Sequence, residues 1–65
     1  INSLKFRRSI YVSEDIKKGE EFSKKNIKVI RPAMGLHPRY FESIIGRKSK
    51  SDYKKGTPIN LDMIL

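Results

Sequence analysis

The chain has 65 residues and a net charge of +8, from 15 lysines and arginines against seven acidic residues. This length allows a single domain that buries only about 60% of the surface its unfolded form exposes. Without cysteines and with one histidine, it can form neither disulfides nor a cysteine–histidine metal cluster. No apolar run approaches the ~20 residues of a membrane span, and cysteine-free composition fits a reducing, cytoplasmic setting. The chain begins with Ile1, so we expect a piece of a longer protein without enzyme chemistry of its own.

The positive charge raises the question of an anionic partner, such as nucleic acid or a membrane surface. The lysine pairs at 17–18, 24–25 and 54–55 are separated by acidic residues, which is typical of a solvated surface. The aromatic residues do not alternate with basic ones at an RNA-binding spacing. We therefore predict no nucleic-acid and no membrane partner. A stand-alone basic interaction module, for nucleic acid or for an assembly protein, is kept as the alternative.

Two segments in the first half have the character of β-strands. Residues 8–13 (RSIYVS) are rich in β-formers, and residues 27–31 (IKVIR) alternate between two faces. No segment sustains a helical stripe for longer than about two turns. Short strands and many turn signals indicate a compact domain that is mainly β with short helical turns.

The segment after the second strand, RPAMGLHP (31–38), holds two of the three prolines and the only histidine. Pro32 fixes its own φ directly after Arg31, so the arginine stands on a stiff base. Gly35 allows the backbone to pass close to another surface. The pattern predicts a rigid irregular loop that carries an exposed arginine.

A short helix is predicted over residues 38–45 (PRYFESII). Pro38 suits the first helical position, His37 suits a turn or helix cap, and Gly46 can end the helix in a left-handed conformation. The apolar side chains that share one helix face are Tyr40, Phe41, Ile44 and Ile45.

The chain also contains an internal repeat, because DIKKGEEFSKKNI (15–27) aligns without gaps on DYKKGTPINLDMI (52–64). Gly19 and Gly56 are predicted to adopt positive φ in matching turns. Two polar residues are placed to cap the helical turns that follow: Ser23 and Asn60. Two copies around one core predict a pseudo-twofold pretzel in which the turns serve structure. The unique segment between them, 28–46, then carries function.

Together these features resemble the C-terminal antifreeze-like (SAF) domain of sialic acid synthases. The resemblance covers residues 7–65 and rests on RPAMGLHP, the closing Gly46-Arg47 and the second DYKKGTPI copy. Ala33 departs from the glycine that many relatives have there, which affects only the local loop path. The resemblance implies a β-clip fold, and GLHP is closer to the pseudaminic acid synthase branch than to the N-acetylneuraminic acid branch.

The resemblance also implies a function for the full-length protein. Such synthases join a (β/α)8 barrel to this domain, with residues 1–7 here as the end of the linker and 8–65 as the domain. The barrel condenses phosphoenolpyruvate with an N-acyl-mannosamine-type sugar, using a divalent metal (Mn or Mg). No cofactor, metal ligand or catalytic residue is expected in this domain. The enzyme is a cytoplasmic, domain-swapped homodimer in which each small domain covers the partner's barrel.

One residue of the family's substrate site is carried over by the resemblance. The arginine of the RP motif, Arg31 here, would contact the N-acyl group of the sugar. The loop that supports it comprises Pro32, Gly35, His37 and Pro38, and the structural turns contain Gly19 and Gly56.

Type III antifreeze protein shares the fold, so ice binding is a rival function. The ice-binding faces of that family are flat and built from small or apolar groups. The matching positions here are charged: Glu14, Asp15, Glu20, Glu21, Lys24 and Lys25. Strongly hydrated side chains cannot match an ice lattice, so we predict no ice binding.

Overall fold

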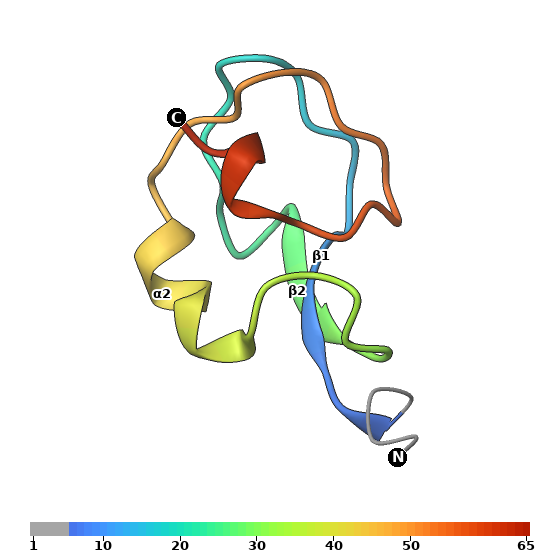
Figure 1. The fold of residues 1–65 in the computed structure, drawn as a ribbon. Helices are drawn as coiled ribbons and strands as arrows, with labels where there is room; N and C mark the ends of the chain where they lie inside the picture. The colour runs from blue at the N-terminus through green and yellow to red at the C-terminus, as the bar shows by residue number, and fades with distance from the viewer. Residues whose placement is uncertain (1–5) are drawn as a thin grey trace.

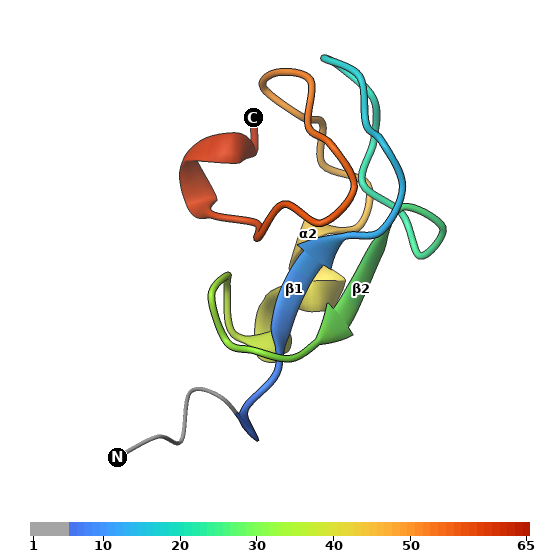
Figure 2. The ribbon, with the colours of Figure 1, turned by 90° about the vertical axis from the view of Figure 1, so that its right-hand side faces the viewer.

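The computed structural model describes residues 6–65, which are drawn in colour in Figure 1. Strands β1 (Ser9–Val12) and β2 (Ile27–Ile30) pair antiparallel, with Ser9 opposite Ile30 and Val12 opposite Ile27 (Figure 2). Both predicted strands are confirmed, each slightly shorter than the predicted range. All of β1 is buried because β2 covers one edge and Pro58 bridges to Tyr11 on the other.

The helix predicted over 38–45 is present as two consecutive pieces. A 3-10 turn, η1 (Pro38–Tyr40), leads directly into the short α-helix α2 (Phe41–Ile44). The first turn is tight because the Tyr40 N–H donates to the His37 carbonyl, the short spacing common at helix N-termini. Gly46 ends the helix with φ +90°, as expected. A third turn, η2 (Leu61–Met63), lies near the C-terminus.

The predicted repeat is confirmed by hydrogen bonds that recur in both copies. The Phe22 N–H donates to the Arg47 carbonyl at 2.8 Å, and its counterpart Ile59 donates to the Ile10 carbonyl at 3.0 Å. Ile16 and Tyr53 occupy matching positions and pair with each other through two backbone hydrogen bonds of 2.8 Å. The chain is therefore a pseudo-twofold pretzel, and its fold class is the predicted one.

The two turns of the repeat hold each other in place. Asp15 Oδ1 accepts a hydrogen bond from the Lys55 N–H at 2.8 Å, and Asp52 Oδ1 accepts one from the Lys18 N–H at 2.6 Å. Gly19 and Gly56 have φ of +84° and +94°, the left-handed conformation expected for both. In Figure 1 the two copies, blue to cyan and orange, run past each other across the top of the molecule.

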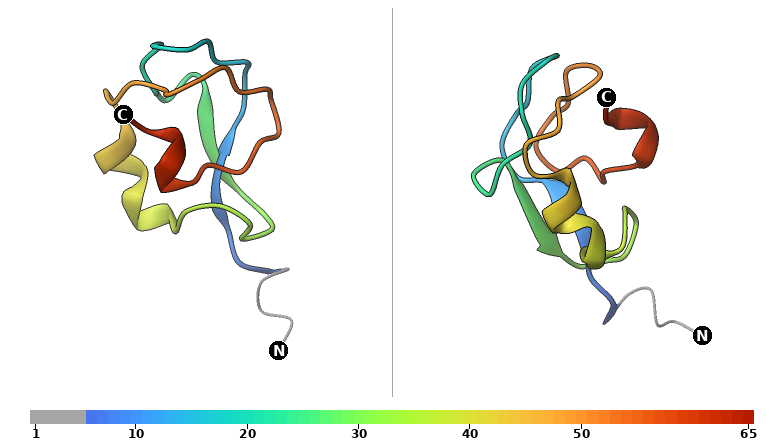
Figure 3. Two further views of the ribbon diagram at one scale, coloured as in Figure 1. Left: turned by 45° about the horizontal axis from the view of Figure 1, so that its top comes forward. Right: turned by 90° about the vertical axis from the view of Figure 1, so that its left-hand side faces the viewer.

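The core lies between the β1–β2 pair, α2 and the apolar residue of each repeat copy. Phe22 and Ile59, which align in the repeat, are both fully buried. Figure 3 shows α2 against the strand pair, where its Ile44 enters the core. The buried apolar cluster comprises Ile10, Val12, Ile16, Phe22, Ile27, Ile44, Ile59 and Met63. Both repeat copies thus contribute to one core, and the unique loop runs around its edge.

Candidate functional site

The loop at residues 31–38 leaves β2, passes the start of β1 and enters η1 (Figure 2). Its first half is anchored through the Pro32 carbonyl, which accepts hydrogen bonds from Tyr11 Oη at 2.8 Å and from Ser9 Oγ at 3.1 Å. Ser9 Oγ also accepts a hydrogen bond from the Gly35 N–H at 3.0 Å. The hydroxyls of two buried β1 side chains, Ser9 and Tyr11, therefore hold the loop in position.

The second half of the loop is joined to backbone on both sides. The Leu36 carbonyl accepts from the Ile10 N–H at 3.0 Å, and the Leu36 N–H donates to the Ile59 carbonyl at 2.8 Å. A Cβ on Gly35 would lie 2.5 Å from the Ile10 carbonyl oxygen and 2.9 Å from the Ile59 nitrogen. The close approach predicted at Gly35 is thus made to the domain's own backbone.

Arg31 stands where this anchored loop begins, and its side chain is exposed. The Arg31–Pro32 peptide is cis. A guanidinium offers five donors in a planar fork and stays charged at physiological pH, which suits a carbonyl or carboxylate partner. Met34 is 63% exposed on the same loop, whereas Leu36 packs against the core. The loop presents one cationic and one apolar side chain from a fixed backbone.

The end of the loop is a helix cap. His37 Nδ1 accepts a hydrogen bond from the Arg39 N–H at 3.0 Å, and Pro38 occupies the first helical position. The Arg39 guanidinium lies 5.5 Å from the centre of the Tyr40 ring. The cap expected at His37 and the helix start expected at Pro38 are confirmed.

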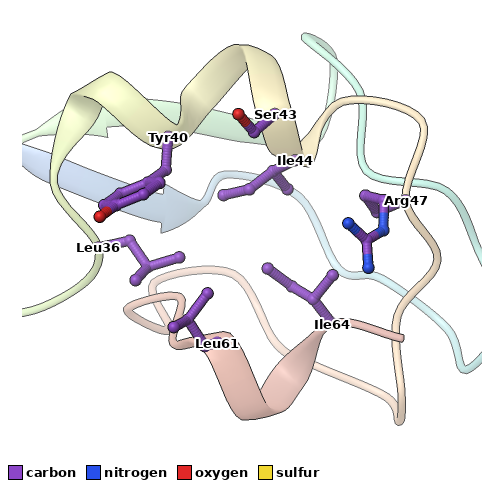
Figure 4. Close-up of a pocket in the computed structure, with 7 residues that line it drawn as sticks. All are labelled: Leu36, Tyr40, Ser43, Ile44, Arg47, Leu61 and Ile64. Carbon is purple, nitrogen blue, oxygen red and sulfur yellow. The ribbon is translucent and has the colours of Figure 1, made fainter.

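A small apolar pocket lies beside the loop, between α2 and η2 (Figure 4). Its volume is about 120 Å³, and Leu36, Tyr40 and Leu61 gather at one end of it. At the other end, Arg47 donates from Nε and Nη2 to the Leu65 carbonyl at 3.1 and 2.7 Å. Leu36 therefore connects the loop to this pocket, while Arg47 fastens the last residue.

Within residues 6–65, the titratable side chains of the 31–38 loop are Arg31 and His37. Within this range, no group of three or more His, Cys, Asp or Glu side chains could hold a metal ion. No helix of the described residues is long and apolar enough to cross a membrane. The pKa of the Tyr53 phenol is raised by burial and, secondarily, by the nearby charge of Asp62, but Tyr53 belongs to the repeat. Nothing described in the loop therefore resembles an acid–base pair.

The model of one protein family, the SAF domain, matches residues 7–65 of the chain. The chain belongs to the SAF domain family. That assignment confirms the resemblance on which the site residues were carried over.

Relatives of this SAF domain include enzymes of nonulosonic acid synthesis. This chain is 51% identical over 51 residues to the pseudaminic acid synthase of Campylobacter jejuni. The match covers 78% of this chain and 15% of that protein. The chain is 44% identical over 59 residues to the pseudaminic acid synthase of Helicobacter pylori, covering 91% of this chain and 17% of the relative. This SAF domain thus spans about a sixth of the length of the curated relatives it matches.

A solved structure shares the fold. The spore coat polysaccharide biosynthesis protein SpsE of Bacillus subtilis superposes with a TM-score of 0.80 at 41% identity, over 89% of this chain and 17% of that one. A third relative, the N,N'-diacetyllegionaminic acid synthase of C. jejuni, is 39% identical over 49 residues, covering 75% of this chain and 15% of the enzyme.

The SAF domain contains loop anchors that sequence reasoning missed. Ser9 and Tyr11 were seen only as strand formers, yet their hydroxyls hold Pro32 and Gly35. The sequence signal was the presence of two hydroxyl residues in a predicted strand, because hydroxyls need hydrogen-bond partners when they are buried. The pairing itself spans more than 20 positions, so only the fold reveals it.

Proposed function

We propose that this SAF domain is the substrate-capping domain of a nonulosonic acid synthase of the pseudaminic acid type. In that enzyme a (β/α)8 barrel with a divalent metal would condense phosphoenolpyruvate with an N-acyl amino sugar. The domain would close the barrel of the other subunit in a homodimer and exclude water from the reaction. The names of its relatives support the reaction class.

The observation that carries the proposal is the exposed Arg31 on a loop anchored at both ends. The Pro32 carbonyl is held by two hydroxyls, and Leu36 is held by two backbone hydrogen bonds. A donor fixed in this way needs little reordering when it meets the acyl carbonyl of a sugar. The role of Arg31 would be to orient the substrate through its fixed donors.

The experiment is steady-state kinetics on the full-length enzyme with Arg31→Ala. We expect turnover of the acylated sugar to fall by two to three powers of ten, since losing a charged donor in a closed site costs roughly 2–4 kcal/mol. Arg31→Lys should rescue poorly, because an ammonium cannot reproduce the planar fork. The melting temperature should stay within a few degrees of the parent, because Arg31 is exposed.

Lys28→Ala is the matched control. Lys28 is an exposed cation within β2, three positions before Arg31, which follows the end of that strand. It should leave turnover unchanged. Near-normal turnover in a folded Arg31→Ala enzyme would refute the proposal and leave Arg31 as an ordinary surface charge.

A further inference from the structure

A second hollow lies beside the loop, where the chain enters β1. Its volume is about 500 Å³, within the range of small-molecule sites. Arg7, Arg8 and His37 line it together with Phe6 and Pro38. Arg31 is not among its described lining residues.

The polar side chains around this hollow are donors. Arg7 and Arg8 each carry a guanidinium, which has five N–H donors and no acceptor. His37 Nδ1 accepts a hydrogen bond from the Arg39 N–H, so the proton of the neutral ring is on Nε2. The neutral ring can therefore present only a donor with its second nitrogen. None of the described residues that line the hollow is acidic.

The hollow is also preformed on its loop side. Gly35 contributes only backbone there, and its N–H is held by Ser9 Oγ at 3.0 Å. Two guanidinium cations lie beside this wall without a carboxylate among the described lining residues, so they would attract an anion into the hollow. Phe6, 71% exposed, and Pro38 add apolar surface beside the donors.

We infer that this hollow, the Arg7–Arg8–His37 hollow, binds the oxyanion of a small organic molecule, either a carboxylate or a phosphate. Planar guanidinium forks bind both groups in bidentate fashion. The apolar wall would lie against the carbon skeleton that bears the anion. The inference is independent of the proposed capping function, since it concerns binding to this chain alone.

The test is an NMR titration of the 65-residue chain, labelled with ¹⁵N, with inorganic phosphate and separately with acetate. Sodium chloride at matched ionic strength serves as the reference. We expect saturable shifts confined to residues 6–8 and 33–38 with at least one of the two probes. A response to phosphate alone would assign a phosphate ligand, and a response to acetate alone a carboxylate.

The variant Arg7→Ala/Arg8→Ala should weaken this binding at least tenfold. Lys24→Ala/Lys25→Ala removes the same charge from an exposed pair that does not line the hollow, and should leave binding unchanged. His37→Asn keeps an acceptor for the Arg39 N–H but removes the ring donor, so it should weaken binding several-fold. Unchanged amide spectra elsewhere would show that each variant is folded.

Two results would overturn the inference. One is a response to phosphate and acetate that only matches sodium chloride. The other is equal weakening by the arginine and lysine pairs, which would mean that net charge alone attracts the anion. Neither result would affect the kinetic test of Arg31, so the two proposals fail separately.

Discussion

Gly35 is the residue on which the geometry of the loop most depends. Its φ is not left-handed, so backbone freedom is not the reason for glycine here. The reason is space, because a Cβ would meet backbone of Ile10 and Ile59, neither of which can rotate away. Sequence reasoning predicted the close approach but not its target, since the target is set by how the repeat copies fold together.

The two reasons for glycine, lack of space and positive φ, can therefore be distinguished by experiment. Gly35→Ala should lower the free energy of unfolding by about 3 kcal/mol, the upper range for overpacking. Gly19→Ala and Gly56→Ala should each cost about 1–2 kcal/mol, because their φ is positive but the space around them is open. Urea denaturation of the three variants checks the order. If Gly35→Ala were the mildest of them, the packing account of the loop would be wrong.

At the scale of elements, the two repeat copies stabilise each other through reciprocal hydrogen bonds. Asp15 accepts from the turn of the second copy, and Asp52 accepts from the turn of the first. The repeat could be predicted from the sequence because both turns contain Lys-Lys-Gly, preceded by an aspartate at the same spacing. The exchange of hydrogen bonds between the two copies could not be predicted, because an exposed aspartate near lysines has many possible partners.

This arrangement predicts equal effects at the matching positions. Asp15→Ala and Asp52→Ala should each destabilise the chain by about 1 kcal/mol, the typical net value of a hydrogen bond in a protein. Asp→Asn keeps a side-chain acceptor at each position and should cost less. Thermal unfolding at pH 7 measures all four variants. A loss at only one of the two aspartates would contradict the pseudo-twofold account of the turns.

The helix after the loop shows where local signals are sufficient. Pro38 and Gly46 marked its start and end correctly, because proline at a first helical position and a left-handed glycine at the end are local effects. The division into η1 and α2 was not predicted. Tyr40 was placed on the apolar face, yet it is 40% exposed at the rim of the pocket in Figure 4.

At the scale of the whole molecule, one scaffold carries two candidate binding features on the same loop, Arg31 and the Arg7–Arg8–His37 hollow. The repeat forms the core, and the unique segment between its copies supplies Arg31 on a fixed backbone. The Arg7–Arg8–His37 hollow lies where that loop meets the entering chain. The scaffold could be predicted from the sequence because its turns and its buried apolar positions repeat. The hollow could not, because it joins residues about 30 positions apart that carry no shared motif.

The proposal that Arg31 contacts the N-acyl group of the sugar can be tested directly. The most direct test compares kcat/KM of the full-length enzyme and its Arg31→Ala variant on two substrates, the acylated sugar and an analogue with a hydroxyl in place of the acylamino group. The account predicts that the variant loses about 100-fold or more on the acylated sugar and less than about tenfold on the analogue, because the analogue has no acyl carbonyl to bind. An equal loss on both substrates would contradict a contact between Arg31 and the N-acyl group.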